Sequence, residues 1–143
     1  DKQAYREYLS KEAPDKSLLK TRLLCDGAYF DLALDALTNN AVHIAPTQKN
    51  NAELSYRLAR IYHNWNKITK AISYYELTVK NYSELKYYYA ANSALQLGLI
   101  YEKQKDLKKA EYYYKKCLTI KTEEYVNSIR QKAKAGLRRI FDK

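Results

Sequence analysis

The chain has 143 residues, a length typical of one domain. Its three Gly and two Pro are too few for a sandwich or barrel, in which a turn recurs about every 8–12 residues, and no apolar run approaches the roughly 18 residues of a membrane-spanning helix. The 26 Lys and Arg exceed the 16 Asp and Glu and give a formal net charge of +10, so an acidic partner has to be considered. Cys25 and Cys117 form no CxxC motif, cannot make a disulfide scaffold, and fit a reducing compartment such as the cytoplasm.

Apolar residues recur at helical spacing between sparse turn signals. Pro14 marks the start of one helix, and Pro46 lies in a polar stretch that marks a clear break. In chain order, the predicted helices are 3–12, 15–26, 29–40, 51–64, 67–81, 84–103, 106–119 and 122–141. The sequence therefore predicts an all-α protein built from helical hairpins.

Two stretches of the sequence share one spacing pattern. The first is Ser55-x2-Leu58-Ala59-x2-Tyr62 followed by Ala71-x3-Tyr75, and the second is Ala94-x2-Leu97-Gly98-x2-Tyr101 followed by Ala110-x3-Tyr114. A weaker copy has Thr21 and Leu24 followed by Ala33-x3-Leu37. In all three copies the small residue of the first helix and the Ala of the second are 12 positions apart.

Over residues 14–124, these spacings resemble the tetratricopeptide repeat (TPR) signature W-x2-L-G-x2-Y followed by A-x3-F. The resemblance implies an α-solenoid of about three helical hairpins, similar to a fragment of a bacterial-type TPR protein, with an amphipathic C-terminal capping helix. We divide the chain into an N-terminal helix or the tail of a preceding repeat (1–13), a degenerate repeat (14–47), two further repeats (52–85 and 91–124) and the cap (123–143). Because Asp1 is not a natural start, the tail of a preceding repeat is favoured for the first segment.

The repeat length departs from the family pattern. The aligned alanines are 38 and 39 residues apart, where the TPR period is about 34. We expect the second insertion to extend the following helix back to residue 84. Another α-solenoid, of the HEAT type with its period of about 40–47 residues, is the alternative fold.

The repeat pattern also predicts packing. Gly98 is expected to face Ala110, and Ala59 to face Ala71, because the two helices of a hairpin need small residues where they approach closely. Cys117 is expected to be a small core residue. In the two tyrosine triplets of the sequence, Tyr88 and Tyr112 are expected to be partly exposed.

No enzyme active site, cofactor or metal is expected in this chain. His43 and His63 have no acidic residue four positions away, no Cys and His cluster has zinc spacing, and there is no Gly-rich phosphate loop. The TPR resemblance implies instead that a protein or peptide segment is held in a concave groove lined by the first helix of each repeat. The residues expected to face this groove are Tyr56, Arg60, His63, Asn64, Asn92, Leu95, Gln96, Leu99 and Lys103.

The Lys and Asn set with which one TPR subclass clamps chaperone tails is not matched, because Tyr56 and Leu95 occupy positions where that set requires polar or basic groups.

Two alternatives to groove binding remain. One is homodimerisation through exposed tyrosine faces.

The other alternative follows from the uneven distribution of charge. Residues 1–85 hold 12 Lys and Arg against 10 Asp and Glu, whereas residues 86–143 hold 14 against 6. A basic stripe in the second part would suit RNA or an anionic surface; it consists of Lys105, Lys108, Lys109, Lys115 and Lys116. Nucleic acid is the less favoured partner, because lysines on an outer helix face also serve solubility and the nearby aromatic residues fall on packing positions.

Overall fold

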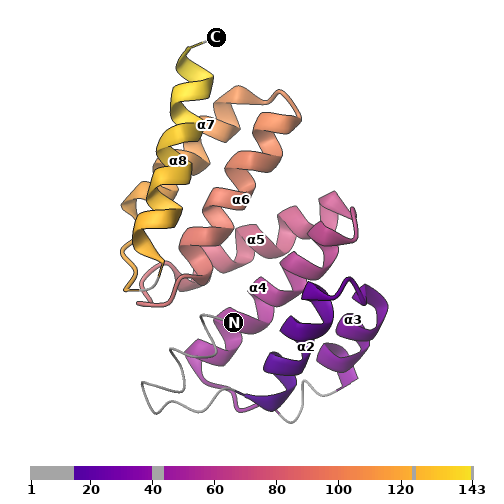
Figure 1. Ribbon diagram of the computed structural model, residues 1–143. Helices are drawn as coiled ribbons and strands as arrows, with labels where there is room; N and C mark the ends of the chain where they lie inside the picture. Colours follow the sequence, from indigo (N-terminus) through magenta and orange to yellow (C-terminus); the bar gives the residue numbers. More distant parts are fainter. Residues whose placement is uncertain (1–14, 40–43, 124, 143) are drawn as a thin grey trace. The chain divides into compact units, whose positions relative to one another are not determined.

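The computed structural model describes residues 15–39, 44–123 and 125–142, and all the regular secondary structure in them is helical (Figure 1). The helices of this part are α2 (Lys16–Asp26), α3 (Phe30–Asn39), α4 (Gln48–Asn64), α5 (Ile68–Tyr82), α6 (Tyr89–Lys103), α7 (Leu107–Thr119) and α8 (Val126–Phe141). The predicted helix 3–12 lies outside the described residues, and the other seven predicted helices are confirmed. None of the described helices is both long and apolar enough to cross a membrane.

The chain divides into two compact units, residues 1–71 and 72–143, and the boundary falls within α5. In the first unit, α2, α3 and α4 pack against one another. Helix α2 begins after Asp15, whose carboxylate accepts hydrogen bonds from the backbone N–H groups of Ser17 (2.9 Å) and Leu18 (3.2 Å). The side chains at the centre of this unit are Leu18, Cys25, Ala33, Leu37, Ile44 and Ile61.

Three turns of the chain share one hydrogen-bond pattern, which supports the three predicted hairpins. In each turn the N–H of the residue that follows the last helical residue by three positions bonds to a carbonyl five residues earlier: Tyr29 to Leu24 (2.9 Å), Lys67 to Tyr62 (2.8 Å) and Asp106 to Tyr101 (2.9 Å). The residue just before each of these donors adopts a left-handed conformation; these residues are Ala28 (φ 64°), Asn66 (φ 62°) and Lys105 (φ 66°). This arrangement is the Schellman motif, which ends a helix and reverses the chain. The degenerate first repeat therefore keeps the same turn geometry as the two clearer ones.

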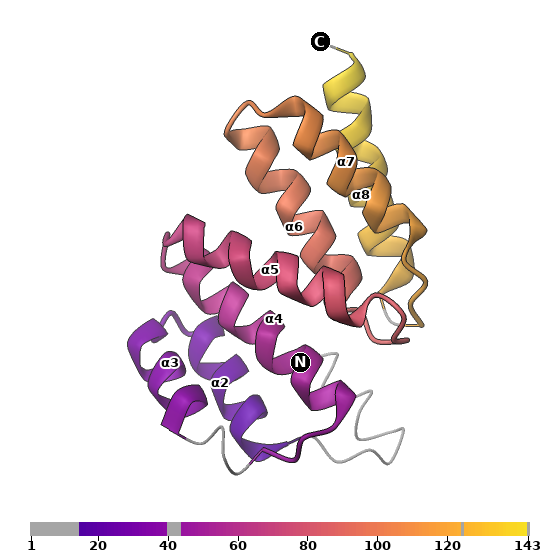
Figure 2. The ribbon, with the colours of Figure 1, turned by 180° about the vertical axis from the view of Figure 1, so that it is seen from behind.

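In the second unit, α6 packs against α7, and α8 packs against both (Figure 2). The ring of Tyr114 on α7 lies between two glycines, Gly98 on α6 and Gly136 on α8. A Cβ added to Gly98 would lie 2.5 Å from Cδ1 of this ring, and a Cβ added to Gly136 would also overlap the ring. The expected pairing of Gly98 with Ala110 stays a prediction. Ala110 is buried, but the group that requires glycine at position 98 is the larger ring of Tyr114, one helical turn further along α7.

The predicted helix 84–103 starts too early, because α6 begins only at Tyr89 and residues 83–88 form turns and bends. The predicted helix 122–141 also begins later, at Val126. The backbone carbonyl of Lys86 accepts hydrogen bonds from the N–H of Glu123 (2.9 Å) and from Oγ1 of Thr122 (2.9 Å). These bonds between the two connecting segments hold the carbonyl of Lys86 outside any helix.

Aromatic packing holds the same two connections together. Tyr88, expected to be partly exposed, is buried instead. Its ring centroid lies 4.7 Å from that of Tyr89 and 5.1 Å from that of Tyr125, with the Tyr125 ring edge-on. The prediction failed because Tyr125 follows α7, and only the folding of unit 72–143 brings it to Tyr88.

Candidate partner-binding site

Four of the predicted groove residues lie on α4 in the first unit. Tyr56 is buried, and the guanidinium carbon of Arg57 lies 5.1 Å from the centroid of its ring. Arg60 and His63 are half-buried. Asn64 is exposed, and its Nδ2 donates a 3.4 Å hydrogen bond to Sγ of Cys25. Of these four residues, Tyr56 offers the least surface to a partner.

The other five predicted residues lie on α6 in the second unit: Asn92, Leu95, Gln96, Leu99 and Lys103. Leu95 is buried, and only 1% of its surface is exposed. Asn92, Gln96 and Leu99 are half-buried, and Lys103 is exposed. Leu95 and Gln96 follow Asn92 by three and four residues, Leu99 follows them by four and three, and Lys103 follows Leu99 by four, so these five side chains lie along one side of the helix.

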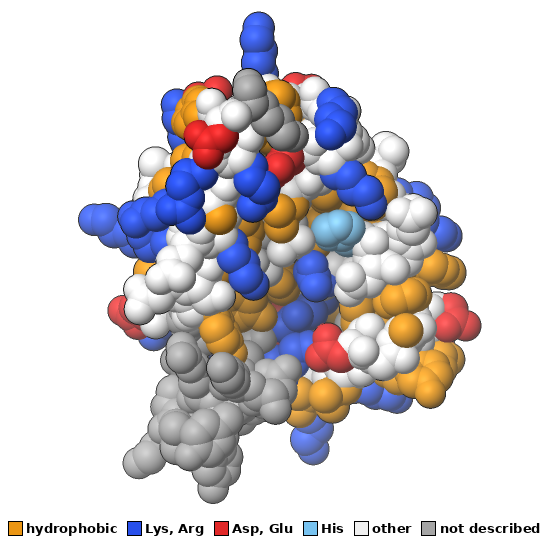
Figure 3. Space-filling model, turned by 45° about the horizontal axis from the view of Figure 1, so that its top comes forward, with side chains coloured by type: hydrophobic (Ala, Val, Ile, Leu, Met, Phe, Trp, Pro, Cys, Tyr) orange, Lys and Arg blue, Asp and Glu red, His pale blue; other side chains and the backbone are white. Residues whose placement is uncertain are grey.

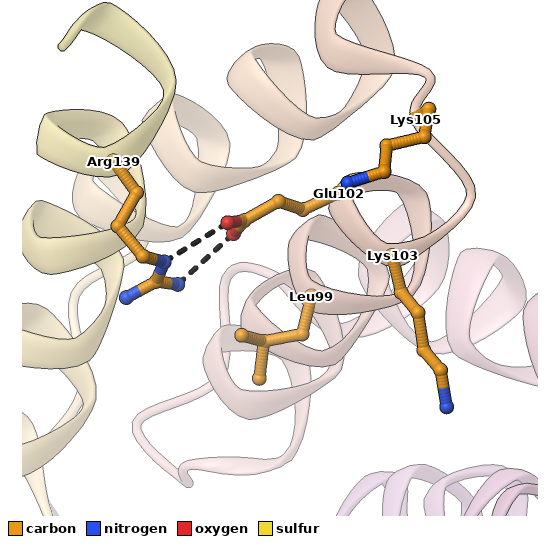
Figure 4. Close-up of a pocket in the computed structure, with 5 residues that line it drawn as sticks. All are labelled: Leu99, Glu102, Lys103, Lys105 and Arg139. Atoms are coloured by element: carbon orange, nitrogen blue, oxygen red, sulfur yellow. Dashed lines mark hydrogen bonds and ion pairs between the residues drawn. The ribbon is translucent and has the colours of Figure 1, made fainter. Parts of the chain in front are cut away.

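A pocket of about 280 Å³ opens beside the C-terminal end of α6 (Figure 4). It is lined by Leu99, Glu102, Lys103, Lys105 and Arg139. Two of these, Leu99 and Lys103, belong to the predicted set. Residues from α6, from the following turn and from α8 meet there, so the packing of the capping helix on α6 forms the pocket.

Arg139 and Glu102 form a two-point ion pair on one side of the pocket (Figure 4). Nε and Nη2 of Arg139 each donate a 2.9 Å hydrogen bond to Glu102, one to each carboxylate oxygen. The same carboxylate accepts a 2.6 Å hydrogen bond from the hydroxyl of Tyr114. The hydrogen bonds to Glu102 raise the pKa of Arg139, so this guanidinium stays charged at every physiological pH. Glu102 is therefore neutralised within the protein.

Lys103 and Lys105 are exposed. Among the described residues, no ion pair or cation–π contact involves either ammonium group. Lys105 is the left-handed residue of the α6–α7 turn, which places it at the rim of the pocket. With Glu102 and Arg139 compensating each other, the two lysines leave the pocket positively charged.

The predicted groove residues did not include Glu102, Lys105 or Arg139, although Lys105 belonged to the predicted basic stripe. Glu102 lies next to the predicted residue Lys103, and Lys105 lies between two predicted helices. The sequence therefore held a weak signal that both residues lie near the site. Arg139 carried none, because it enters the pocket only when α8 folds against α6.

The basic stripe lies on and beside α7. Figure 3 shows that Lys and Arg side chains are also scattered over the face of the molecule that it presents. Lys105, Lys108, Lys109 and Lys115 are exposed, and Lys116 is half-buried. Two of these lysines also meet acidic groups: Lys115 lies 2.8 Å from Glu111 and Lys109 lies 4.0 Å from Asp106. The exposure predicted for Tyr112 is confirmed at 60%.

Side chains suited to metal binding are not gathered in the described part of the chain. No group of three or more His, Cys, Asp or Glu residues there could hold a metal ion. Burial raises the pKa of Cys117 to about 12, so its thiol stays protonated and is a poor nucleophile. The predicted core position of Cys117 is confirmed, with 1% of its surface exposed.

The comparisons with known proteins agree with the turns and hairpins. A family model described as "Tetratricopeptide repeat" matches residues 50–123, slightly more than half of the chain. The chain belongs to the tetratricopeptide repeat family. The matched TPR segment begins in α4 and ends beyond α7, so it contains the two hairpins that carry the clearest spacing pattern. No match was found among curated proteins or among solved structures.

TPR domains typically act as protein–protein interaction modules, and membership of the family suggests that role for this chain. The TPR match ends at residue 123, before α8, which supplies Arg139 to the pocket. The pocket therefore combines a TPR helix with the helix that follows the matched repeats.

Proposed function

We propose that this TPR chain binds an extended segment of a partner protein and that the pocket beside α6 receives a carboxylate of that segment. The observation that carries the proposal is the pair Lys103 and Lys105 at a pocket whose own carboxylate, Glu102, is already paired with Arg139. An entering carboxylate would meet two ammonium groups without competing against an uncompensated internal acid. Opposite charges at this range attract and also accelerate encounter.

The remaining surface of α6 suits the backbone of such a segment. Leu99 lines the pocket and gives the methylene groups of an acidic side chain an apolar contact. Gln96 and Asn92 lie one and two turns before Leu99 on α6, and side-chain amides can both donate to and accept from a peptide backbone. Leu95, being buried, supports this surface from within.

Within the first unit, the predicted residues of α4 remain candidates for contact with a partner. Arg60, His63 and Asn64 offer basic and amide groups at partly or fully exposed positions. Tyr56 is proposed to act by supporting α4 from within, since its ring is buried against Arg57.

The proposal is tested by selecting peptides from a random library with the full chain and measuring their affinity by fluorescence anisotropy. We expect the selected peptides to be enriched in Asp, Glu or a free C-terminal carboxylate. Lys103→Glu/Lys105→Glu is expected to weaken their binding about tenfold or more, because it replaces attraction by repulsion. The matched control is Lys132→Glu/Lys134→Glu, which makes the same change of charge at two exposed positions of α8.

Two results would contradict the proposal. One is the enrichment of peptides without acidic groups. The other is an equal loss of affinity in the pocket variant and the control, which would mean that only the overall charge of the protein matters.

A further inference from the structure

Two exposed patches outside the pocket carry opposite charges. The first, which we name the acidic face, lies at the end of the α2–α3 hairpin and consists of Leu23, Asp26, Tyr29, Leu32 and Asp35. All five side chains are exposed, and the three large apolar ones expose 55%, 58% and 50% of their surface. Residues 23–48 contain three Asp and not one Lys or Arg.

The turn geometry makes the acidic face continuous. Ala28 is left-handed, and the chain reverses so that the ring of Tyr29 lies over Gly27, within 3.0 Å of where a Cβ would be. Tyr29 therefore covers the end of α2, one turn beyond Leu23. Leu32 follows Tyr29 by three positions and lies on the same side of the hairpin end.

The second patch, which we name the basic face, consists of Lys108, Tyr112, Lys115 and Lys116 on α7 and Phe141 on α8. Spacings of four residues place Lys108, Tyr112 and Lys116 in one row on the helix surface. Lys115 connects the row to α8, because its Nζ lies 5.9 Å from the centroid of the Phe141 ring. Tyr112 and Phe141 expose 60% and 61% of their surface.

Each face combines exposed large apolar side chains with charges of a single predominant sign. Exposed apolar groups of this size bordered by polar residues are typical of interaction sites. Aromatic residues at such sites supply buried area, while opposite charges fix the orientation of the partners. The acidic face and the basic face are complementary in both respects, and both belong to the same chain.

We infer that a second copy of this chain is the partner, with the acidic face of one copy docked on the basic face of the next. In such a contact two different surfaces meet, one contributed by each copy. The contact does not use the pocket of Lys103 and Lys105, and it stands independently of peptide binding.

The self-association is tested by sedimentation velocity of the full chain, after nuclease treatment, from about 10 µM to about 500 µM. We expect the sedimentation coefficient to rise with concentration above that of the monomer and to fall when salt is raised to about 1 M, where exposed charges are screened. Constant monomer behaviour over the whole range overturns the inference. Association that disappears with the nuclease also overturns it, since nucleic acid would then be the partner of the basic face.

Charge reversal distinguishes this contact from a dimer in which like faces meet. Asp26→Lys/Asp35→Lys reverses the acidic face, and Lys108→Glu/Lys116→Glu reverses the basic face. We expect each variant alone to associate at least tenfold more weakly, because like charges then meet. An equimolar mixture of the two is expected to regain association, because each face then finds an opposite one on the other variant.

Several results overturn the inference. One is a variant that still associates as strongly as the wild type. Another is a mixture that stays as weak as its components. Lys132→Glu/Lys134→Glu serves as the control for net charge and is expected to associate like the wild type; an equal loss in this control contradicts a specific contact.

Circular dichroism establishes that each variant is folded. If a charge-reversed variant does not fold, Tyr29→Ser and Tyr112→Ser test the same two faces at exposed positions. Each is expected to weaken association at least tenfold, and unchanged association in both overturns the inference.

Discussion

The hydroxyl of Tyr114 donates a hydrogen bond of 2.6 Å to Oε1 of Glu102, and the bond joins α7 to α6 at the edge of the pocket. Arg139 extends the connection to α8 through its two bonds to the same carboxylate. The ring of Tyr114 fills the space left by the missing side chains of Gly98 and Gly136. Three helices of the second unit therefore meet at one tyrosine, and the geometry of the pocket depends on it.

Gly98→Ala is predicted to lower the free energy of unfolding by about 1–3 kcal/mol, as overpacking of a core does. Alanine is the better helix former, but its Cβ would lie 2.5 Å from a tyrosine ring that is fully buried and has no room to move. Urea unfolding followed by circular dichroism measures the change.

Gly27→Ala is the matched control for this substitution. Its Cβ would lie 3.0 Å from the ring of Tyr29, which is 58% exposed and free to turn away, and Gly27 has a φ of −84°, which alanine tolerates. We expect a change of less than about 1 kcal/mol. Equal destabilisation by the two substitutions would show that loss of glycine, and not contact with Tyr114, is responsible.

A double-mutant cycle on Glu102 and Arg139 is predicted to give a coupling free energy of about 1 kcal/mol. The pair is bidentate and its carboxylate is mostly buried, but 47% of the Arg139 side chain is exposed, so solvent screens part of the attraction. The comparison pair Glu111 and Lys115 has a single contact between more exposed groups and is expected to give about 0.3–0.5 kcal/mol. Similar values for the two pairs would argue against a special role of Arg139 in holding α8.

The free energy of unfolding is predicted to fall as the pH rises from about 9 to about 12. Burial, with further contributions from Glu76 or Glu102, raises the pKa of Tyr101, Tyr113 and Tyr114 above the usual value of 10.0. Above pH 10 the unfolded chain therefore releases protons that the folded chain retains, and by linkage the stability decreases. Below about pH 9 these groups are protonated in both states and add no pH dependence.

Urea unfolding at about pH 8, 10 and 11 measures this decrease, and absorbance at 295 nm follows tyrosinate formation in the folded chain. Tyr113→Phe is expected to make the decrease smaller, since it removes one of the raised groups. A free energy of unfolding that stays constant or rises over this range contradicts the prediction.

Cys117 is predicted to resist alkylation in the folded protein at about pH 8.5 and to react within minutes once urea unfolds the chain. Burial raises its pKa to about 12 and leaves 1% of its surface exposed, so both thiolate formation and access require unfolding. Mass spectrometry after iodoacetamide treatment identifies the modified residue. Rapid labelling of Cys117 in the absence of urea would contradict its place in the core.

Local sequence determined the helices and the turns between them. Helical periodicity depends only on neighbouring residues, and the small residues 12 positions apart located the hairpins, including the degenerate first one. The three left-handed residues that end the hairpin helices, Ala28, Asn66 and Lys105, follow the same internal spacing of 38 and 39 residues. The TPR family was readable from the sequence for this reason.

Contacts between distant segments decided the rest. The bonds from Thr122 and Glu123 to the carbonyl of Lys86 set the late start of α6, and Tyr125 buries Tyr88, although nothing near Lys86 in the sequence signals either contact. The ring between Gly98 and Gly136 and the bond between Arg139 and Glu102 likewise depend on how α8 packs. Periodicity shows which side of a helix is buried, but it does not show which side chain of another helix will contact that side. The sequence therefore determined the helices and their repeat, and only tertiary packing decided which charges and rings form the pocket.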